Sequence, residues 1–487
     1  MSAADGSAGH DSGPVTPNGQ QSSPVSTAAA PPSTSLRAGA TQPPHGDPHS
    51  RADTRRRVKA ILVGSIGNLI EWFDVYAYAA FALYFAGSFF PTTDPVAQQL
   101  SAAAIFAVGF VARPFGGLLF GHVADRHGRR NALMASVLLM CFGSLLIAAT
   151  PSYATIGVGA PIMLAIARIL QGISQGGEYG TSATYLAEIS HPERRGFYSG
   201  VWYMTLIGGQ LCAILLLLIL QKVFLTPEEL RAWGWRIPFV IGAALAIYAM
   251  WMRKDMHESG HFIAASRGAD KVRATSRGDV SRRSGLNAVM GHWKPMLLVV
   301  GISVGGVSAF YTYTTYMQKF LKLSVGLTDD QTTMVVFVSL LVAIVLQPLG
   351  GALSDRVGRK PLLVTFGVLG TLFTYPLMST LQQTRSPIVA TLLICAAWTI
   401  VSLYTSITAI IKAELFPTNV RALGVGLPYA LTASVFGGSV DSVALWFKNA
   451  GNESGFFWYA TALIFVSLLF YLFMPDMKRH SRMEQHA

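Results

Sequence analysis

Gly121-His-Val-Ala-Asp-Arg-His-Gly-Arg-Arg130 is a short charged stretch between two long apolar runs, and the chain contains it twice. The second copy, Gly351-Ala-Leu-Ser-Asp-Arg-Val-Gly-Arg-Lys360, lies 230 residues further along. Both glycines, the aspartate and two of the arginines recur at that same offset. A duplication in matching surroundings predicts two homologous halves, each with a charged turn that joins two hydrophobic helices.

The composition is that of a membrane protein. Of the 487 residues, 51% are hydrophobic and only 13% are charged, whereas soluble domains carry roughly 25% charged residues. Apolar stretches of about 20 residues recur between residues 58 and 474, and each can cross a bilayer as a helix. We therefore expect an all-α polytopic membrane protein with twelve transmembrane helices in two six-helix pseudo-repeats.

The same patterns divide the chain into five segments. Residues 1–54 are rich in Ser, Pro, Ala and Gly and are expected to form a disordered cytoplasmic tail. Six-helix bundles are expected at 55–254 and 293–475, separated by a basic cytoplasmic connector at 255–292. A short cytoplasmic tail, 476–487, follows the last helix.

The formal net charge of +12 does not indicate a nucleic-acid partner. When the loops are assigned alternately to two sides, one set holds eighteen Lys and Arg residues and the other holds seven. Because Lys and Arg accumulate in cytoplasmic loops, the asymmetry predicts that both termini are cytoplasmic. The basic excess thus sets topology in the lipid bilayer.

No motif for catalysis is visible. The chain has no Ser/His/Asp arrangement, zinc-ligand spacing, Walker loop or dinucleotide fingerprint. Cys141, Cys212 and Cys395 all lie inside apolar runs, so no disulfide framework is indicated. We expect neither an enzyme nor a cofactor or metal.

Charged residues inside the apolar runs are the candidate functional residues. In the run 58–85, Glu71, Asp74 and Tyr78 share one helix face, with Glu71 roughly 17 Å from the cytoplasmic end. An ionised carboxyl at that depth costs about 2.5–3.5 kcal/mol, so these groups are expected to carry protons or contact substrate. The alternative is neutralisation by a neighbouring arginine.

Two further runs carry arginine. Arg113 stays charged and needs a carboxylate, which either the protein or a substrate could supply. The run 161–189 has a polar stripe at spacings of three and four residues: Arg168, Gln171, Gln175, Glu178 and Ser182. Such a stripe cannot face lipid. We expect it to line a cavity, because its glutamines need partners that a tight glycine-packed seam would not supply.

The second half offers fewer charges. Thr315 and Lys319 share a face of the run 293–321. Lys319 is expected near the outer end, where it either snorkels to the surface or attracts an anion into the outer mouth. Asp441 is a further proton-coupling candidate.

The duplicated turn resembles the signature loop of the major facilitator superfamily. Other stretches resemble its metabolite:proton symporter branch: Gly67-Asn-Leu-Ile-Glu-Trp-Phe-Asp74, Arg113-Pro-Phe-Gly-Gly117, Gln171-Gly-Ile-Ser-Gln-Gly-Gly-Glu-Tyr-Gly180 and Trp233-Gly-Trp-Arg-Ile-Pro-Phe239. Within that branch, Tyr203-Met-Thr-Leu-Ile-Gly-Gly-Gln-Leu211 and Lys412-Ala-Glu-Leu-Phe-Pro-Thr-Asn-Val-Arg-Ala-Leu-Gly-Val-Gly426 are similar to permeases for 2-oxoglutarate (alpha-ketoglutarate).

The resemblance implies two helical bundles that give alternating access to a central cavity, in a bacterial inner (plasma) membrane protein expected to be monomeric. It implies import of a small carboxylate, 2-oxoglutarate in particular, together with protons. Proton cotransport is physically sensible, because an interior-negative potential opposes each negative charge by about 2.3 kcal/mol per 100 mV. Open alternatives are symport of citrate, shikimate, proline or betaine, and a membrane sensor that transports nothing.

We assign roles to the candidates accordingly. Substrate contacts are expected from Arg113, Arg168, Gln171, Gln175, Tyr78, Thr315 and Lys319. Proton coupling is expected from Glu71, Asp74, Glu178 and Asp441.

The duplicated turn itself lies too near the cytoplasmic surface to bind substrate. We expect it to form an ion-pair latch that locks the outward-open state, the alternative being charge that only sets topology. The expected members are Gly121, Asp125, Arg126, Arg129, Glu188, Arg195, Asp355, Arg356, Arg359, Glu414 and Arg421.

Overall fold

The computed structural model describes residues 51–475, except 128, 177–182, 184, 185, 187–189, 254–290, 418 and 419. For residues 51–66, 121, 122, 124–127, 129–133, 192, 249, 252 and 253 it describes the backbone alone. Most of the expected tails and connector therefore lie outside the described residues. The first helix begins at Arg51, inside the segment 1–54 that we expected to be a tail.

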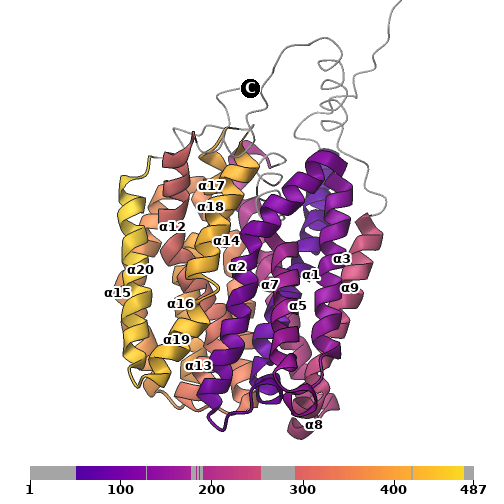
Figure 1. The fold of residues 1–487 in the computed structure, drawn as a ribbon. Helices are drawn as coiled ribbons and strands as arrows, with labels where there is room; N and C mark the ends of the chain where they lie inside the picture. The colour runs from indigo at the N-terminus through magenta and orange to yellow at the C-terminus, as the bar shows by residue number, and fades with distance from the viewer. Residues whose placement is uncertain are drawn as a thin grey trace, which may run out of the picture. The chain divides into compact units, whose positions relative to one another are not determined.

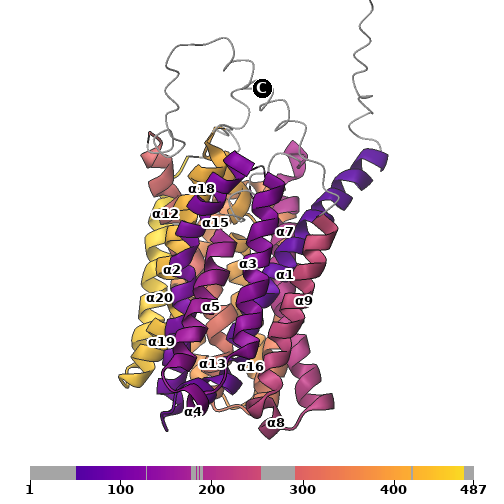
Figure 2. The same cartoon turned by 45° about the vertical axis from the view of Figure 1, so that its right-hand side comes forward.

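All regular structure in the described residues is helical (Figures 1 and 2). The long helices of the N-terminal half are α1 (Arg51–Phe89), α2 (Pro95–His127), α3 (Arg129–Ala149), α5 (Gly159–Gly176), α7 (Arg195–Ile219) and α9 (Ile237–Arg253). Those of the C-terminal half are α12 (Trp293–Tyr311), α14 (Asp329–Val357), α15 (Arg359–Gln383), α16 (Pro387–Thr405), α18 (Arg421–Phe436) and α20 (Glu453–Phe473). Shorter helices are α4 (Tyr153–Ile156), α8 (Pro227–Ala232), α13 (Met317–Phe320), α17 (Thr408–Glu414) and α19 (Val440–Asn449).

The expected twelve membrane crossings are all present in the described part of the chain. Nine helical stretches are long and apolar enough to span a bilayer, and two shorter apolar ones are Met134–Ala149 and Gly234–Tyr248. The twelfth crossing is α5, which carries the polar stripe. The alternation of apolar runs with short polar turns was sufficient to count the helices.

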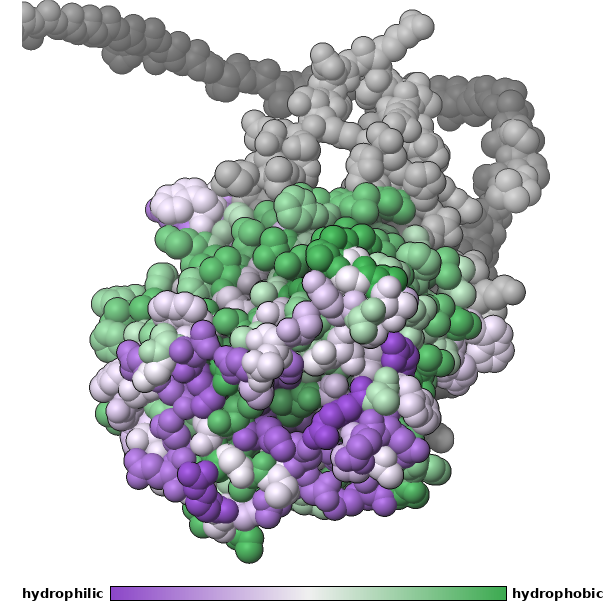
Figure 3. Space-filling view, turned by 60° about the horizontal axis from the view of Figure 1, so that its bottom comes forward, coloured by the Kyte–Doolittle hydropathy of each residue, from purple (hydrophilic) through white to green (hydrophobic). Residues whose placement is uncertain are grey.

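The outward faces of the helices are apolar. Phe115 is 66% exposed, and Val111 and Leu349 are each more than half exposed. Figure 3 shows hydrophilic residues gathered on the end that carries α4 and α8, with hydrophobic side chains around the flanks. We call this the far end, and the end formed by the duplicated turns the turn end. Exposed apolar area of this extent is what a lipid-facing surface requires.

Glycine lets α2 and α5 pack with their backbones in contact. A Cβ added to Gly172 would lie 1.9 Å from the carbonyl oxygen of Gly109, and one on Gly176 would lie 1.8 Å from that of Arg113. Small residues are the usual means of such close approach between membrane helices. The contact brings the side chains of Arg113 and Gln175 together.

Glycines also bring the two halves of the protein into backbone contact. On α7 and α14, a Cβ on Gly351 would lie 2.2 Å from the carbonyl oxygen of Gly196. A Cβ on Gly200 would lie 2.3 Å from that of Gln347. Van der Waals contact between backbones therefore joins the N-terminal half to the C-terminal half.

Several crossings are interrupted. The chain from α12 to Val325 contains two π-helical turns, Thr312–Tyr316 and Leu321–Val325. The eleventh crossing breaks between α18 and α19 at residues 437–439, and the tenth breaks between α16 and α17 at residues 406–407. Hydropathy reads each crossing as continuous, so the sequence did not predict these irregularities, which are frequent at functional sites.

Replacing Gly172 with alanine is expected to destabilise the fold by about 3 kcal/mol, the upper end for overpacking, because the new methyl group overlaps a backbone carbonyl. The apparent melting temperature of the purified protein in detergent measures the effect. Gly208→Ala is the matched control, since its nearest neighbour would be a Leu69 side-chain carbon at 3.5 Å. Equal melting temperatures for the two variants would contradict the backbone contact.

Candidate functional site

A small pocket lies between the halves, where α1, α2, α5 and α18 meet. Its volume is about 30 Å³, room for two or so water molecules at roughly 10–15 Å³ each. The lining residues are Asn68, Glu71, Trp72, Arg113, Gln175, Gly176, Gly426, Tyr429, Ala430 and Ala433. In this arrangement of the halves the pocket is smaller than a metabolite.

Arg113 is the cation of this pocket and is 8% exposed. Its Nη2 donates a hydrogen bond to Oε1 of Gln175 at 2.8 Å. Arg113 Nε and Gln175 Nε2 are buried donors without an acceptor among the described residues. Buried donors are nearly always satisfied in proteins, so these two have the capacity to bind a water molecule or an oxygen atom of a ligand in the pocket.

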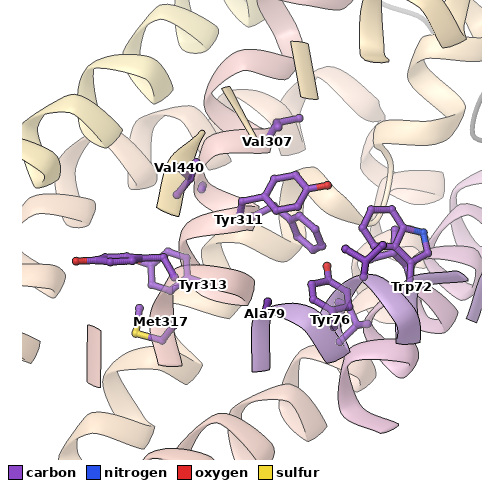
Figure 4. Packing of buried hydrophobic residues seen from close by; sticks show 14 of the residues in the cluster. Trp72, Tyr76, Ala79, Val307, Tyr311, Tyr313, Met317 and Val440 are labelled. Atoms are coloured by element: carbon purple, nitrogen blue, oxygen red, sulfur yellow. The ribbon is translucent and has the colours of Figure 1, made fainter. Parts of the chain in front are cut away.

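Aromatic rings pack next to Arg113. The guanidinium carbon of Arg113 lies 3.7 Å from the ring centre of Phe110, and that ring meets Tyr311 edge-on at 5.2 Å. Figure 4 shows Trp72 and Tyr76 of α1 beside Tyr311 of α12. Phe110 also packs against Gly438, where α18 and α19 separate. Rings from both halves therefore form one aromatic cluster next to Arg113.

Asp74 belongs to a separate network inside the N-terminal half. Its Oδ1 accepts a hydrogen bond from Ser144 at 2.5 Å and its Oδ2 accepts one from Gln171 at 2.6 Å. Gln171 Oε1 in turn accepts from Arg168 Nη1 at 2.7 Å. The amide of Gln171 therefore links a buried carboxylate to a buried guanidinium.

The network also touches aromatic rings. The guanidinium carbon of Arg168 lies 4.6 Å from the ring centre of Tyr78 and 4.9 Å from that of Phe106. Tyr78 donates its hydroxyl to the carbonyl oxygen of Ala102 at 3.0 Å. Cation–π contacts and hydrogen bonds together hold Arg168 away from lipid.

These positions bear on two expectations. Arg168 and Gln171 lie in the interior of the N-terminal half, so of the described stripe residues only Gln175 lines the pocket. Glu71 lines the pocket whereas Asp74 does not, although both belong to α1. Side chains of α1 and α3 supply the partners that we expected a cavity to provide. Glu178 and Ser182 lie outside the described residues.

The structure also corrects the placement of Lys319. Its side chain is 2% exposed and forms an ion pair with Asp441, instead of snorkelling to the far end or facing an outer mouth. Thr315 Oγ1 donates to Asp441 Oδ1 at 2.8 Å. The apolar run continues beyond Leu321 to Val325, which leaves Lys319 inside the bundle beside α19. Lys319, Asp441 and Thr315 therefore bind one another inside the C-terminal half.

Lys412 is a functional candidate to which the sequence analysis gave no role. It is 0% exposed, and its Nζ lies 3.6 Å from the ring centre of the pocket residue Tyr429. The available signal was a lysine inside an apolar membrane crossing, which by itself marks a functional position.

The second copy of the duplicated turn bridges the halves at the turn end. Asp355 of α14 accepts hydrogen bonds from the backbone N–H groups of Gly196 and Phe197, both at 2.8 Å, and it pairs with Arg359 at 2.8 Å. A carboxylate of one half thereby caps the first turn of α7 in the other, where the helix dipole favours negative charge.

The remaining latch residues are distributed as follows. Arg421 is buried and donates to the carbonyl oxygen of Phe416 at 3.2 Å, Glu414 is buried, and Arg356 is exposed. Arg195 begins α7. Glu188 and the side chains of Asp125, Arg126 and Arg129, as well as the packing of Gly121, lie outside the described residues.

Ion pairs also join the halves at the far end, where none was expected. Lys222 pairs with Asp330, and Arg231 pairs with Asp329 at 3.3 Å. The structure is therefore bridged at both ends, with the pocket between them.

Comparison with known proteins gives four findings. The family described as "Sugar (and other) transporter" matches residues 60–487. The alpha-ketoglutarate permease of Escherichia coli (strain K12) is 46% identical over 421 residues, covering 86% of this chain and 94% of its own length. The citrate-proton symporter of Klebsiella pneumoniae is 31% identical over 413 residues, covering 84% and 90% respectively. The xylose transporter XylE from E. coli, in a partially occluded inward-open conformation, superposes with a TM-score of 0.66 at 18% identity, covering 86% of this chain and 98% of its own.

The Lys319–Asp441 pair generates a stability prediction. Lys319→Met and Asp441→Asn should each destabilise the protein by about 3–5 kcal/mol, because each leaves a buried charge without its partner. The double variant should lose less stability than the two single variants lose together, because it leaves no charge unpaired. Thermal unfolding in detergent of the wild type, the two single variants and the double variant gives a double-mutant cycle. Strictly additive effects on stability would show that the two charges do not interact.

Proposed function

The chain belongs to the sugar (and other) transporter family of the major facilitator superfamily, and on that premise we propose that it is a proton-coupled symporter importing 2-oxoglutarate. The relative at 46% identity is an alpha-ketoglutarate permease and matches nearly its whole length, which supports this substrate. A second relative is a citrate-proton symporter, which supports both a carboxylate substrate and proton coupling.

The observation that carries the proposal is the pair of unsatisfied donors in the pocket, Arg113 Nε and Gln175 Nε2. A carboxylate supplies two oxygens with several lone pairs, and a guanidinium is the side chain best shaped to bind it. Asn68 adds an amide to the same lining. In this proposal one carboxylate of the substrate binds Arg113 and Gln175 when the halves open.

Proton coupling is assigned to carboxyls of the N-terminal half. Glu71 lines the same pocket as Arg113, where an incoming anion changes the charge around this carboxyl. Asp74 is linked to Arg168 through Gln171, so movement of either side chain changes how well its charge is stabilised. Asp441 is already neutralised by Lys319, which makes it a less suitable carrier.

Alternating access then requires the bridges at the two ends to break in turn. The Asp355 contacts with α7 must be released to open the turn end. The Lys222–Asp330 and Arg231–Asp329 pairs must be released to open the far end.

Uptake of radiolabelled 2-oxoglutarate into vesicles tests the proposal. An imposed pH gradient, alkaline inside, should drive accumulation, and a protonophore should abolish it. Arg113→Gln should lower uptake at subsaturating substrate at least about 10-fold, the effect of losing a charged hydrogen-bond donor. Arg385→Gln, which removes an arginine whose Nη1 donates to the carbonyl oxygen of Val325, is the control and should transport normally.

Two results would contradict the proposed proton-coupled import of 2-oxoglutarate. Uptake that a protonophore leaves unchanged rules out proton coupling, and normal transport by Arg113→Gln rules out its role in binding. Unlabelled citrate, shikimate, proline and betaine in the same assay decide between substrates. Citrate is the second candidate, on the strength of the 31% identical relative.

A further inference from the structure

Tyr311 of α12 brings a hydroxyl group of the C-terminal half next to the cation of the N-terminal half. Its side chain is buried, and its ring meets Phe110 edge-on at 5.2 Å. The guanidinium carbon of Arg113 lies 3.7 Å from the centre of that same Phe110 ring. The Tyr311 hydroxyl also interacts electrostatically with Arg113 and Glu71, the two charged residues that line the pocket. The hydroxyl therefore lies beside the proposed carboxylate site.

The proton of this hydroxyl is available to a ligand. Tyr311 Oη is buried without a hydrogen-bond partner among the described residues, so it forms no hydrogen bond with Glu71. A guanidinium only donates hydrogen bonds, so Arg113 can act on the lone pairs of the phenol oxygen but cannot accept its proton. Tyr311 can therefore donate to an oxygen of an anion that Arg113 binds.

The neighbouring tyrosines are less suited to this role. Figure 4 shows the hydroxyl of Tyr311 pointing towards Trp72 and Tyr76 of α1, whereas that of Tyr313 points away from them. Trp72 lines the pocket. The hydroxyl of Tyr76 interacts with the side chain of Thr314. Of the tyrosines labelled in Figure 4, Tyr311 is thus the one whose proton can reach a ligand beside Trp72.

The position of the Tyr311 hydroxyl determines which group of a substrate it can bind. A 2-oxo acid carries its oxo oxygen on the carbon next to one carboxylate, whereas the second carboxylate of 2-oxoglutarate lies at the other end of the carbon chain. A donor that acts directly on Arg113 is close to the first of these positions. A buried donor placed there discriminates against analogues that lack the oxygen, because they leave the donor without an acceptor.

We propose that Tyr311 is a specificity-determining residue that donates its hydroxyl to the 2-oxo oxygen of a substrate whose adjacent carboxylate is held by Arg113 and Gln175. The inference rests on the function proposed above and specifies the substrate class as 2-oxo acids. Because Tyr311 and Arg113 belong to different halves, such a substrate contacts both of them. It stabilises the arrangement in which the halves are together more than an analogue without the 2-oxo group does.

Glutarate tests this assignment, because it has the five-carbon dicarboxylate chain of 2-oxoglutarate without the 2-oxo group. Displacement of radiolabelled 2-oxoglutarate from the purified protein by each unlabelled compound gives both affinities. The wild type should bind 2-oxoglutarate about 10-fold more tightly than glutarate. Tyr311→Phe removes the hydroxyl and keeps the ring. It should weaken 2-oxoglutarate binding about 10-fold and leave glutarate within about 2-fold of wild type.

Controls separate binding from folding. Tyr313→Phe removes another buried hydroxyl from the same membrane crossing, one that points away from Trp72, and should leave both affinities unchanged. Tyr311→Phe should retain the melting temperature of the wild type in detergent, because the hydroxyl that it removes forms no hydrogen bond within the described residues. Tyr311→Met also lacks the hydroxyl and should show the same loss of preference.

Equal weakening of 2-oxoglutarate and glutarate by Tyr311→Phe would overturn the inference, because the hydroxyl would then act on a group that both compounds share. A wild type without preference, or a folded Tyr311→Phe variant that keeps the wild-type preference, would overturn it as well while leaving the proposed function intact. Wild-type protein that neither binds nor takes up 2-oxoglutarate would overturn the proposed function and this inference together.

Discussion

Hydrocarbon cannot solvate charge, so every ionised group between the two ends of this protein has to be stabilised by the protein itself. The structure uses three solutions. Lys319 and Asp441 neutralise each other directly. Asp74 and Arg168 are linked through the amide of Gln171. Arg113 and Lys412 lie against aromatic rings in the middle of the bundle.

These three kinds of contact differ in how easily a ligand can replace them. A direct ion pair inside a low-dielectric interior is strong, and losing one partner is costly. Contact with a ring leaves an arginine or lysine able to accept a better partner, because a carboxylate binds it with charge-assisted hydrogen bonds. Arg113 stacks on Phe110 and lines the pocket, whereas Lys319 is held by Asp441, which an anion would have to displace.

Close backbone packing determines where these groups stand. Gly172 and Gly176 bring α5 against α2, so that Gln175 reaches Arg113 across the seam. Gly196 and Gly351 do the same for α7 and α14, where Asp355 caps a helix of the opposite half. Small residues therefore set both the geometry of the pocket and the contacts that must separate for the halves to move.

The sequence by itself determined the number of helices, the duplication and the identity of most intramembrane charges, because apolar runs and their polar exceptions are local features of the chain. It could not determine which charges meet. Residues on one face of a helix, such as Glu71 and Asp74, face different neighbours once other helices pack around them. The pairing of Lys319 with Asp441 and the place of Lys412 beside the pocket depend on contacts between segments far apart in the chain. Only the tertiary structure decides those contacts, because side-chain partners are set by helix packing and not by spacing along one helix.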